Sequence, residues 1–306
     1  MERGGCMAIY KNKKMLFIFL FPAMLLIGAL IFLPIILNVY YSLFKWTAYS
    51  KSMKFVGLEY YIKLFSDKNV WSAFRNNVLY AVISIIFQAT LGLVIAYIIN
   101  NIASKKIAVV SRVIIFIPAV VSITAIGLLW VIIYNPSIGF LNPMLEAVGL
   151  GGVIKDWLGD KSTAMMAVIM VSQWQYMGEM VMLYTVGLQN IPTELFESAK
   201  IDGASSIQTF FRITVPLIKE TILMNVMITI IGAFMVFDEV YVMTSGGPGR
   251  STEVLASLLY KTGFRQDNMG YACAIGVFMF VVTFIFAIVE LKMYNVKETM
   301  GGGKSE

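Results

Sequence analysis

Residues 194–216 read ELFESAKIDGASSIQTFFRITVP, and they form a polar, charged segment between long apolar stretches. The whole chain has 306 residues, of which 58% are hydrophobic and only 14% are charged. Soluble domains carry about 25% charged residues, so this composition indicates a chain that lies largely in a lipid bilayer. In such a chain, a charged segment is expected to be either a solvated connector or a docking surface for a water-soluble partner.

Six apolar runs surround this segment, and each is long enough to cross the hydrocarbon core, which takes about 20 residues. They predict an all-α membrane protein with six transmembrane helices in a single transmembrane domain over residues 15–296. Tails are expected at residues 1–14 and 297–306, the second flexible because it is rich in glycine. The helices are predicted at residues 15–44, 76–100, 108–134, 162–188, 221–243 and 271–293.

The distribution of lysines predicts the orientation in the membrane. Lys11, Lys13 and Lys14 precede the first apolar run, and Lys105-Lys106 occupy a tight turn. Cytoplasmic loops carry an excess of basic residues, although over the whole chain the bias is slight. We therefore expect a multi-pass protein of the cell membrane with both termini, and residues 194–216, in the cytoplasm. The sequence leaves the type of cell envelope open.

The composition argues against several functional classes. The chain has no histidine, and Cys6 and Cys273 are far apart, so neither a metal site nor a redox cluster is expected. Lysines and arginines are scattered along the chain, which does not favour nucleic-acid binding. An intramembrane enzyme would need a catalytic pair, and Asp238 has no second intramembrane aspartate, so we expect no catalytic residues. Six helices without an internal repeat disfavour a stand-alone secondary transporter.

The C-terminal sequence Gly301-Gly302-Gly303-Lys304-Ser305 looks like the end of a phosphate-binding loop. That loop needs a further glycine five residues before the last glycine, and this position is Glu298. It also needs a following helix, for which the printed sequence leaves no room. We therefore expect no cofactor, and no nucleotide site, in this chain.

Residues 190–219 predict two short helices joined by a tight turn. Asn190–Thr193 has the pattern of a helix start, with a proline next to the first turn. Glu194 and Glu197 then place negative charge near the positive end of the helix dipole. Asp202-Gly203 is expected to end this helix, because glycine readily adopts the left-handed conformation of a C-cap.

The second helix of this segment is expected to begin after Ser205, whose hydroxyl can cap it, and to end at Val215-Pro216. Ala199, Gly203 and Ala204 are small, so another surface could approach the backbone there. The same pattern fits a plain amphipathic connector on the membrane surface, and the local physical chemistry leaves both interpretations open.

Several sets of residues resemble known proteins. The segment itself resembles the EAA motif of ABC importer permeases, with Ser198 where the motif usually has alanine. Other stretches resemble carbohydrate permeases of the maltose-transporter type. The residues of the motif are Glu197-Ser198-Ala199, Asp202-Gly203-Ala204, Phe210, Ile213 and Pro216, and the other stretches are 55–59, 134–136, Gly139, Asn142, 237–238, 246–249 and 251–253.

The resemblance implies a type I ABC importer permease (MetI-like) fold and a permease subunit of an ATP-driven carbohydrate importer. In that family the charged loop forms a coupling helix that docks on an ATPase subunit. It implies four kinds of partner: a second homologous permease, two ATP-binding subunits that hold ATP and Mg, an extracellular or periplasmic solute-binding protein, and the carbohydrate. The residues that would couple to the ATPase are Glu194, Glu197, Ala199, Asp202, Gly203, Ala204 and Pro216.

The fourth apolar run predicts a wall of the substrate pathway. Ser172, Gln175, Tyr176 and Glu179 are spaced to lie on one face of a helix. Polar groups inside the membrane are expensive and tend to face a cavity or a partner. Hydroxyl-matching groups with an aromatic ring suit a sugar, although hydrogen bonds to the partner permease are an alternative.

Phe237 and Asp238 in the fifth run are further candidates for the substrate pathway. The alternative for Asp238 is a carboxylate that accepts hydrogen bonds from the Gly246-Gly247 turn. The fourth-run face has an acidic residue and no basic one, which favours a neutral or cationic solute. Another solute, such as glycerol phosphate or a polyamine, stays open, as do the sugar and its chain length.

Overall fold

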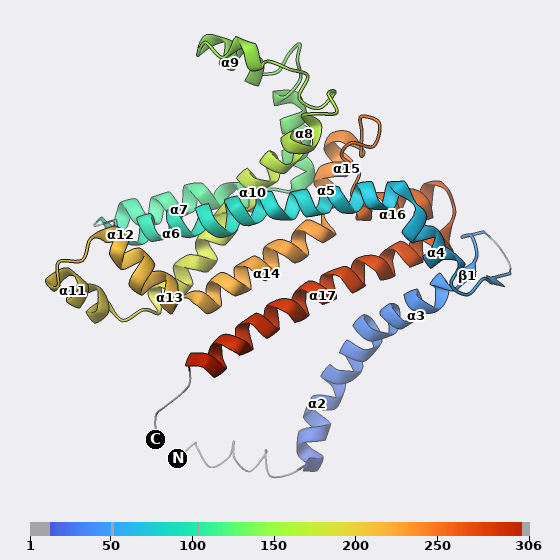
Figure 1. Ribbon diagram of the computed structural model, residues 1–306, viewed down its shortest axis with the longest axis horizontal. Helices are drawn as coiled ribbons and strands as arrows, with labels where there is room; N and C mark the ends of the chain where they lie inside the picture. The colour runs from blue at the N-terminus through green and yellow to red at the C-terminus, as the bar shows by residue number, and fades with distance from the viewer. Residues whose placement is uncertain (1–12, 50–51, 103, 302–306) are drawn as a thin grey trace. The chain divides into compact units, whose positions relative to one another are not determined.

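The computed structural model describes residues 13–49, 52–102 and 104–301, and it is almost entirely helical (Figure 1). Its residues cluster into two compact units. One comprises the described residues up to Ser66 together with Leu259–Phe278, and the other comprises Asp67–Leu258 and the residues from Met279 onward. Residues 1–12 of the predicted N-terminal tail, and residues 302–306 of the predicted C-terminal tail, lie outside the described residues.

The first unit begins with one long helical stretch that continues through a π-helical turn. A short antiparallel strand pair and a further helix follow it. Asn38 Nδ2 donates to the Cys273 carbonyl at 3.3 Å, and the Ala48 amide donates to Asp267 at 2.7 Å, so the two chain segments of this unit are joined. The elements are α2 (Lys13–Ile27), η1 (Gly28–Phe32), α3 (Leu33–Ser42), β1 (Phe44–Lys45), β2 (Lys54–Phe55), α4 (Glu59–Ser66) and η5 (Lys261–Arg265).

The second unit is organised around α10 (Ala164–Gln189), which packs against helices from before and after it in the chain. Its other elements are α5 (Lys68–Ser84), η2 (Ile85–Leu91), α6 (Gly92–Asn100), α7 (Lys105–Val120), α8 (Ile123–Ile133), α9 (Leu141–Ala147), η3 (Gly151–Val153), α11 (Thr193–Ile201), α12 (Ser206–Thr209), η4 (Phe210–Thr214), α13 (Val215–Leu217), α14 (Lys219–Met235) and α15 (Asp238–Thr244). Two helices have residues in both units, α16 (Leu255–Tyr260) and α17 (Met269–Gly301).

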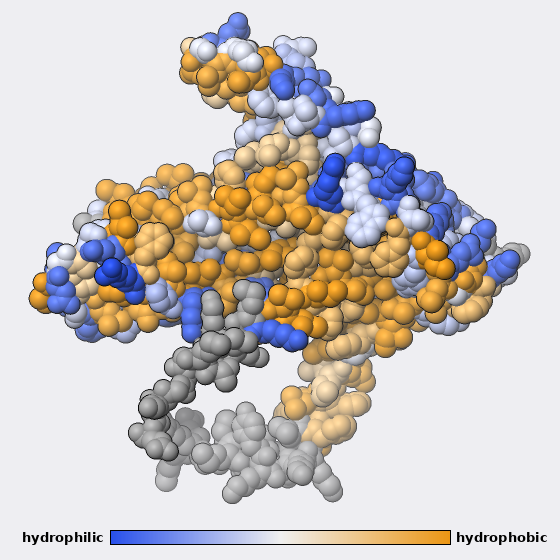
Figure 2. All heavy atoms as spheres, in the orientation of Figure 1, coloured by the Kyte–Doolittle hydropathy of each residue, from blue (hydrophilic) through white to orange (hydrophobic). Residues whose placement is uncertain are grey.

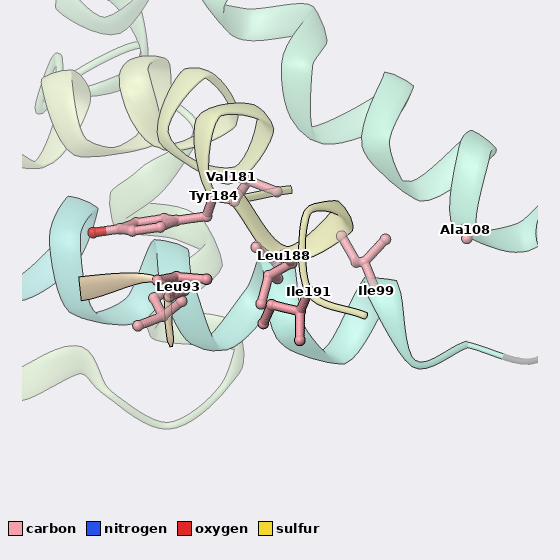
Figure 3. Close-up of a cluster of buried hydrophobic side chains, with 9 residues drawn as sticks. Leu93, Ile99, Ala108, Val181, Tyr184, Leu188 and Ile191 are labelled. Atoms are coloured by element: carbon pink, nitrogen blue, oxygen red, sulfur yellow. The ribbon is translucent and has the colours of Figure 1, made fainter. Parts of the chain in front are cut away.

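A buried apolar cluster joins the C-terminal half of α10 to α6 and α7 (Figure 3). We call it the α10 cluster. It also takes in Ile218, between α13 and α14, which is 3% exposed. Its members are Leu93, Ala96, Ile99, Ala108, Val181, Tyr184, Leu188, Ile191 and Ile218.

The outward-facing side chains of the helices are largely apolar, as a bilayer requires. Figure 2 shows hydrophobic residues over the visible faces of the long helices. In the helical stretch Phe17–Ser42, no part of the most apolar 18-residue portion is buried within the chain. Leaving such surface in water would be costly, so lipid or partner subunits must cover it.

Within the described residues, three helical stretches are long and apolar enough to cross a membrane, and two sharply bent pairs bring the number to at most five. The six-helix count is therefore not confirmed. Helix α10 is 26 residues long, but polar residues in its centre lower its hydropathy. The three stretches are Phe17–Ser42, Lys68–Asn100 and Met269–Lys292, and the bent pairs are Lys105–Val120 with Ile123–Ile133 (93°) and Ser206–Leu217 with Lys219–Met235 (74°).

Two predicted helices, at 108–134 and 221–243, are broken, so their prediction as single helices is wrong. The first breaks at Val121, three residues after Pro118, where the backbone becomes extended. The second ends at Met235, and a new helix starts at Asp238. Both breaks lie inside apolar runs, so hydropathy alone does not reveal them.

Several predicted boundaries also shift. The second predicted helix begins at Lys68 rather than residue 76, because the Asp67 side chain caps it by accepting from the Asn69 amide at 2.9 Å. The last helix continues to Gly301, past the predicted start of the tail at residue 297. At the start of the second predicted helix, a side-chain cap therefore extends the helix beyond its apolar run.

Candidate functional site

The largest group of predicted pathway residues meets at one cavity of about 360 Å³, which lies within the second unit. Its walls come from α5 and η2 on one side, α10 on another, and the junction of α14 with α15 on a third. Of the six residues predicted for the substrate pathway, five line it, namely Ser172, Tyr176, Glu179, Phe237 and Asp238. The cavity thus joins residues from two apolar runs that the sequence treated separately.

Gln175 is the exception, because it does not line this cavity. Its side chain is buried, and its Nε2 donates to the Val121 carbonyl at 3.2 Å, at the break between α7 and α8. The face of α10 that lines the cavity extends to Met180, so its centre is rotated away from Gln175. Helical spacing alone could not fix where that face is centred.

Asp238 lies at the start of α15 and is exposed to the cavity. The alternative prediction placed its carboxylate against the Gly246-Gly247 turn. In the structure, both amides of that turn donate to Thr244: Gly246 to Oγ1 at 3.3 Å and Gly247 to the carbonyl at 2.9 Å. The turn therefore satisfies its own donors without Asp238.

The break between α14 and α15 positions this acidic corner. Helix α14 ends at Met235, Val236 is extended, and α15 restarts with Asp238 and Glu239 in its first turn. Phe237 stacks on Tyr241 of the same turn, with ring centroids 5.1 Å apart. Discontinuous helices are a recurrent way of placing polar groups at solute sites in transporters.

Sequence reasoning missed three cavity residues on the second helical stretch, Tyr80, Ser84 and Gln88. They recur every four residues, which is the same helical spacing that identified the face of α10. The Tyr80 hydroxyl donates to Ser172 Oγ, and Gln173 Nε2 donates to Ser84 Oγ at 3.0 Å. These bonds hold α5 against α10 along the wall of the cavity.

Glu239 was also missed, although it adjoins a predicted residue. It is 5% exposed and lines the cavity beside Tyr176. With Glu179 and Asp238 it makes three carboxylates at one cavity, and none of the lining residues is a lysine or an arginine. Polar oxygens and an aromatic ring are therefore what this cavity offers a ligand.

Gly178 fixes how closely α10 approaches α7. A Cβ at Gly178 would lie 2.2 Å from the Ile115 carbonyl oxygen and 2.7 Å from the Phe116 Cα, both backbone atoms. Small residues allow such backbone contact between membrane helices. The cavity wall on α10 is thus held by direct contact of two helix backbones.

The segment 190–219 forms the predicted helix, turn and helix. Helix α11 begins at Thr193, and its end has both hydrogen bonds of a Schellman motif. The Ala204 amide donates to the Ala199 carbonyl at 2.9 Å, and the Gly203 amide donates to the Lys200 carbonyl at 3.2 Å. Gly203 adopts φ +74°, which explains why glycine stands there.

The second helix of the segment starts with a complete capping box. The Ser205 hydroxyl accepts from the Gln208 amide at 3.3 Å, and Gln208 Oε1 accepts from the Ser205 amide at 2.8 Å. The predicted end at Val215-Pro216 is slightly early, because the helix continues through Pro216 to Leu217. Its path includes the π-helical stretch η4 before the sharp bend to α14.

One side of this segment packs on the protein and the other is open. Phe196, Phe210 and Val215 pack against the α10 cluster. On the open side, Ile201 is 85% exposed and Ile207 is 71% exposed. The open side therefore presents apolar side chains together with charged ones.

The predicted coupling residues divide between these two sides. Ala199 is buried, so its small size serves packing within the chain. Ala204 is half-buried, and a Cβ at Gly203 would meet no atom within 4 Å. The remaining four residues, Glu194, Glu197, Asp202 and Pro216, are exposed.

Comparison with known proteins agrees with this arrangement. Residues 88–291 match the family described as binding-protein-dependent transport system inner membrane component. The chain is 45% identical over 287 residues to a probable ABC transporter permease protein, YurN, of Bacillus subtilis, covering 94% of this chain and 98% of that protein. It is 32% identical over 284 residues to the trehalose/maltose transport system permease protein MalF of Thermococcus litoralis, covering 93% and 95%.

A solved structure shares the fold. It is the crystal structure of a bacterial ABC transporter involved in the import of the acidic polysaccharide alginate, matched with a TM-score of 0.79 and 23% identity, over 92% of this chain and 96% of that one. The predicted type I ABC importer permease (MetI-like) fold is thereby confirmed. On the extent of these matches, the chain belongs to the family of binding-protein-dependent transport system inner membrane components.

Proposed function

We propose that this chain is a permease subunit of an ATP-driven importer of carbohydrate, mono- or oligosaccharide, and forms half of the translocation pathway. The observation that carries the proposal is the cavity between α5, α10 and the α14–α15 break. It sets the Tyr176 and Phe237 rings among hydroxyl, amide and carboxylate groups. Sugars need such hydrogen-bond partners together with an aromatic surface, and the related trehalose/maltose permease supports this substrate class.

In this proposal the chain crosses the membrane six times, with both termini in the cytoplasm. Helix α10 would be the remaining span, since its polar residues face the cavity and neighbouring helices rather than lipid. The segment 190–219 then lies on the cytoplasmic side. A second homologous permease covers the exposed apolar helix faces, and the family description supports a solute-binding protein on the outer side.

Energy enters through the segment 190–219. Two ATP-binding subunits hold ATP and Mg and hydrolyse the nucleotide, while this chain carries out no covalent chemistry. The exposed side of α11 and α12 docks on an ATPase subunit, and the packed side transmits its movement to the α10 cluster. The cavity then alternates between outward and inward access, driven by the different affinities of the two states for nucleotide.

A permease for glycerol phosphate is the weaker alternative. A phosphate group would need basic side chains or backbone donors, and the lining residues of the cavity are acidic, polar or apolar. A polyamine would suit the carboxylates but would leave the aromatic and hydroxyl groups without a role. The mixture of groups favours a carbohydrate.

The test is reconstitution of the complete transporter. The chain, its second permease, the ATPase and the solute-binding protein encoded nearby would be assembled in proteoliposomes, and uptake of labelled sugars would be measured. We expect uptake that requires both ATP and the binding protein, and no ATP hydrolysis by the purified chain alone. Robust hydrolysis by the chain alone, or no uptake of any sugar by the assembled transporter, would contradict the proposal.

A further inference from the structure

We propose that the cavity selects for charge: it takes a sugar that bears a protonated amino group, held by Glu239 and Asp238, and it rejects uronic acids. This inference rests on the proposed carbohydrate function and deepens it. It assigns Glu239 as a specificity-determining residue. Four observations in the structure carry it.

The first observation is the position of Glu239. The break between α14 and α15 turns it inward at the cavity, where it is 5% exposed, while the adjacent Asp238 is exposed to the same space. Tyr176 lies within electrostatic range of both, and of Glu179. The three acidic residues therefore line the same cavity as the Tyr176 ring.

The second observation is the lack of a counter-ion. Among the residues that the structure describes, no lysine or arginine lines the cavity, and no ion pair joins any of the three carboxylates. Of the three, only Glu239 is removed from water, and its hydrogen-bond partner there is the neutral Tyr176 hydroxyl. A buried carboxylate without a counter-charge is strongly disfavoured. A cationic group on the solute would supply the missing counter-charge, and a carboxylate on the solute would add to the repulsion.

The third observation is Gln88, in the π-helical stretch η2. It is 5% exposed and lines the same cavity, yet within the described ranges no residue hydrogen-bonds its side chain. Its amide atoms are not fully buried, so they open onto the cavity, and π-helical turns are frequent at functional sites. An unpaired amide here fits a ligand hydroxyl, which can both donate and accept.

The fourth observation separates an organic cation from a metal ion. In the described part of the chain, no three acidic, cysteine or histidine side chains are grouped closely enough to hold a metal. The cavity volume of about 360 Å³ has room for sugar-sized groups. An amino group would lie toward Glu239 and Asp238, with ring hydroxyls toward Gln88 and Tyr176.

The experiment measures binding to the purified, fully assembled transporter without its solute-binding protein, so that only the permease cavity selects. Three disaccharides with the same β-linkage are compared: a glucosamine disaccharide, cellobiose, and a glucuronate disaccharide. We expect the glucosamine disaccharide to bind about tenfold more tightly than cellobiose, and the glucuronate disaccharide to bind most weakly. Glu239→Gln should remove most of the tenfold preference.

Glu290→Gln is the matched control, because Glu290 is a buried carboxylate of the same chain that does not line the cavity. It should keep the preference of the unmodified protein. Equal binding of all three sugars, no binding of the glucosamine disaccharide, or an unchanged preference in Glu239→Gln would each overturn the inference. If the inference fails but the transporter still takes up a neutral sugar with ATP, the proposed function stands. Only the absence of all sugar uptake would contradict the proposed function.

Discussion

Two stretches of α10 have different surroundings. Around Ser172, Tyr176 and Glu179 the helix borders a cavity lined by polar groups. From Val181 to Leu188 it is packed into an apolar cluster that also anchors the segment 190–219. A cavity has few contacts to lose when its walls move, whereas a close-packed cluster moves as a body. One helix therefore combines a region suited to binding with a region suited to transmitting force.

The largest effect is expected where α10 touches α7. Gly178→Leu should lower the free energy of unfolding by about 3 kcal/mol or more, because the new side chain meets backbone that has no room to shift. Thermal unfolding of the purified chain in detergent would measure it. Gly28→Ala is the control, since a Cβ at Gly28 meets nothing within 4 Å. Equal melting temperatures for the two variants would show that the backbone contact is not needed.

The second prediction compares these two stretches of α10 directly. Leu188→Ala should cost about 3 kcal/mol, since Leu188 is 2% exposed in the α10 cluster and its removal leaves a cavity. Glu179→Gln, in the stretch that borders the cavity, should change the free energy of unfolding by no more than about 0.5 kcal/mol because Glu179 is exposed. Similar losses of unfolding free energy in both variants would contradict the distinction between the packed stretch and the stretch that borders the cavity. Denaturant titration followed by tryptophan fluorescence would measure both variants.

A third prediction concerns the turn of the segment 190–219. Gly203→Val should cost about 1–2 kcal/mol of local strain, because a side chain at φ +74° is disfavoured. Uptake should fall at least about tenfold, while capture of the sugar by the solute-binding protein stays intact. Ser198→Ala, at an exposed site on the same helix, should keep normal uptake. Unchanged uptake in Gly203→Val would remove the docking role.

The smallest effect is expected at the capping box. Ser205→Ala should loosen the start of α12 by about 1 kcal/mol. Hydrogen exchange of the Gln208 amide, which loses its acceptor, would report it. Ser206→Ala is the control, because Ser206 is exposed and is not the capping residue. Equal exchange rates in the two variants would contradict the cap.

The fold was predicted from the resemblance to a known family, whereas the features predicted correctly from residue patterns alone were local. The turn at Gly203 and the cap at Ser205 depend on a few adjacent residues, and the structure has both. The cavity face of α10 followed from helical spacing, but its centre depends on which neighbours surround the helix, and Gln175 therefore fell outside it.

The features that were missed depend on tertiary structure. The break after Met235, which turns Glu239 inward, lies in an apolar run with no proline or glycine at the junction. The stripe of Tyr80, Ser84 and Gln88 was visible at helical spacing, but only its contact with α10 shows that it borders the same cavity. Helical spacing identifies polar faces, and packing decides which of them meet.

In the proposed mechanism, the bend of 74° at Ile218 lets α14 act as a lever. Ile218, which is buried in the α10 cluster, would be its pivot, with the segment 206–217 as the short arm. The long arm has 17 residues, which corresponds to about 25 Å of helix. A tilt of about 10° at the pivot would displace its far end by roughly 4 Å. Asp238 and Glu239 follow that end directly, so a small push on the segment would arrive, amplified, at the acidic corner of the cavity.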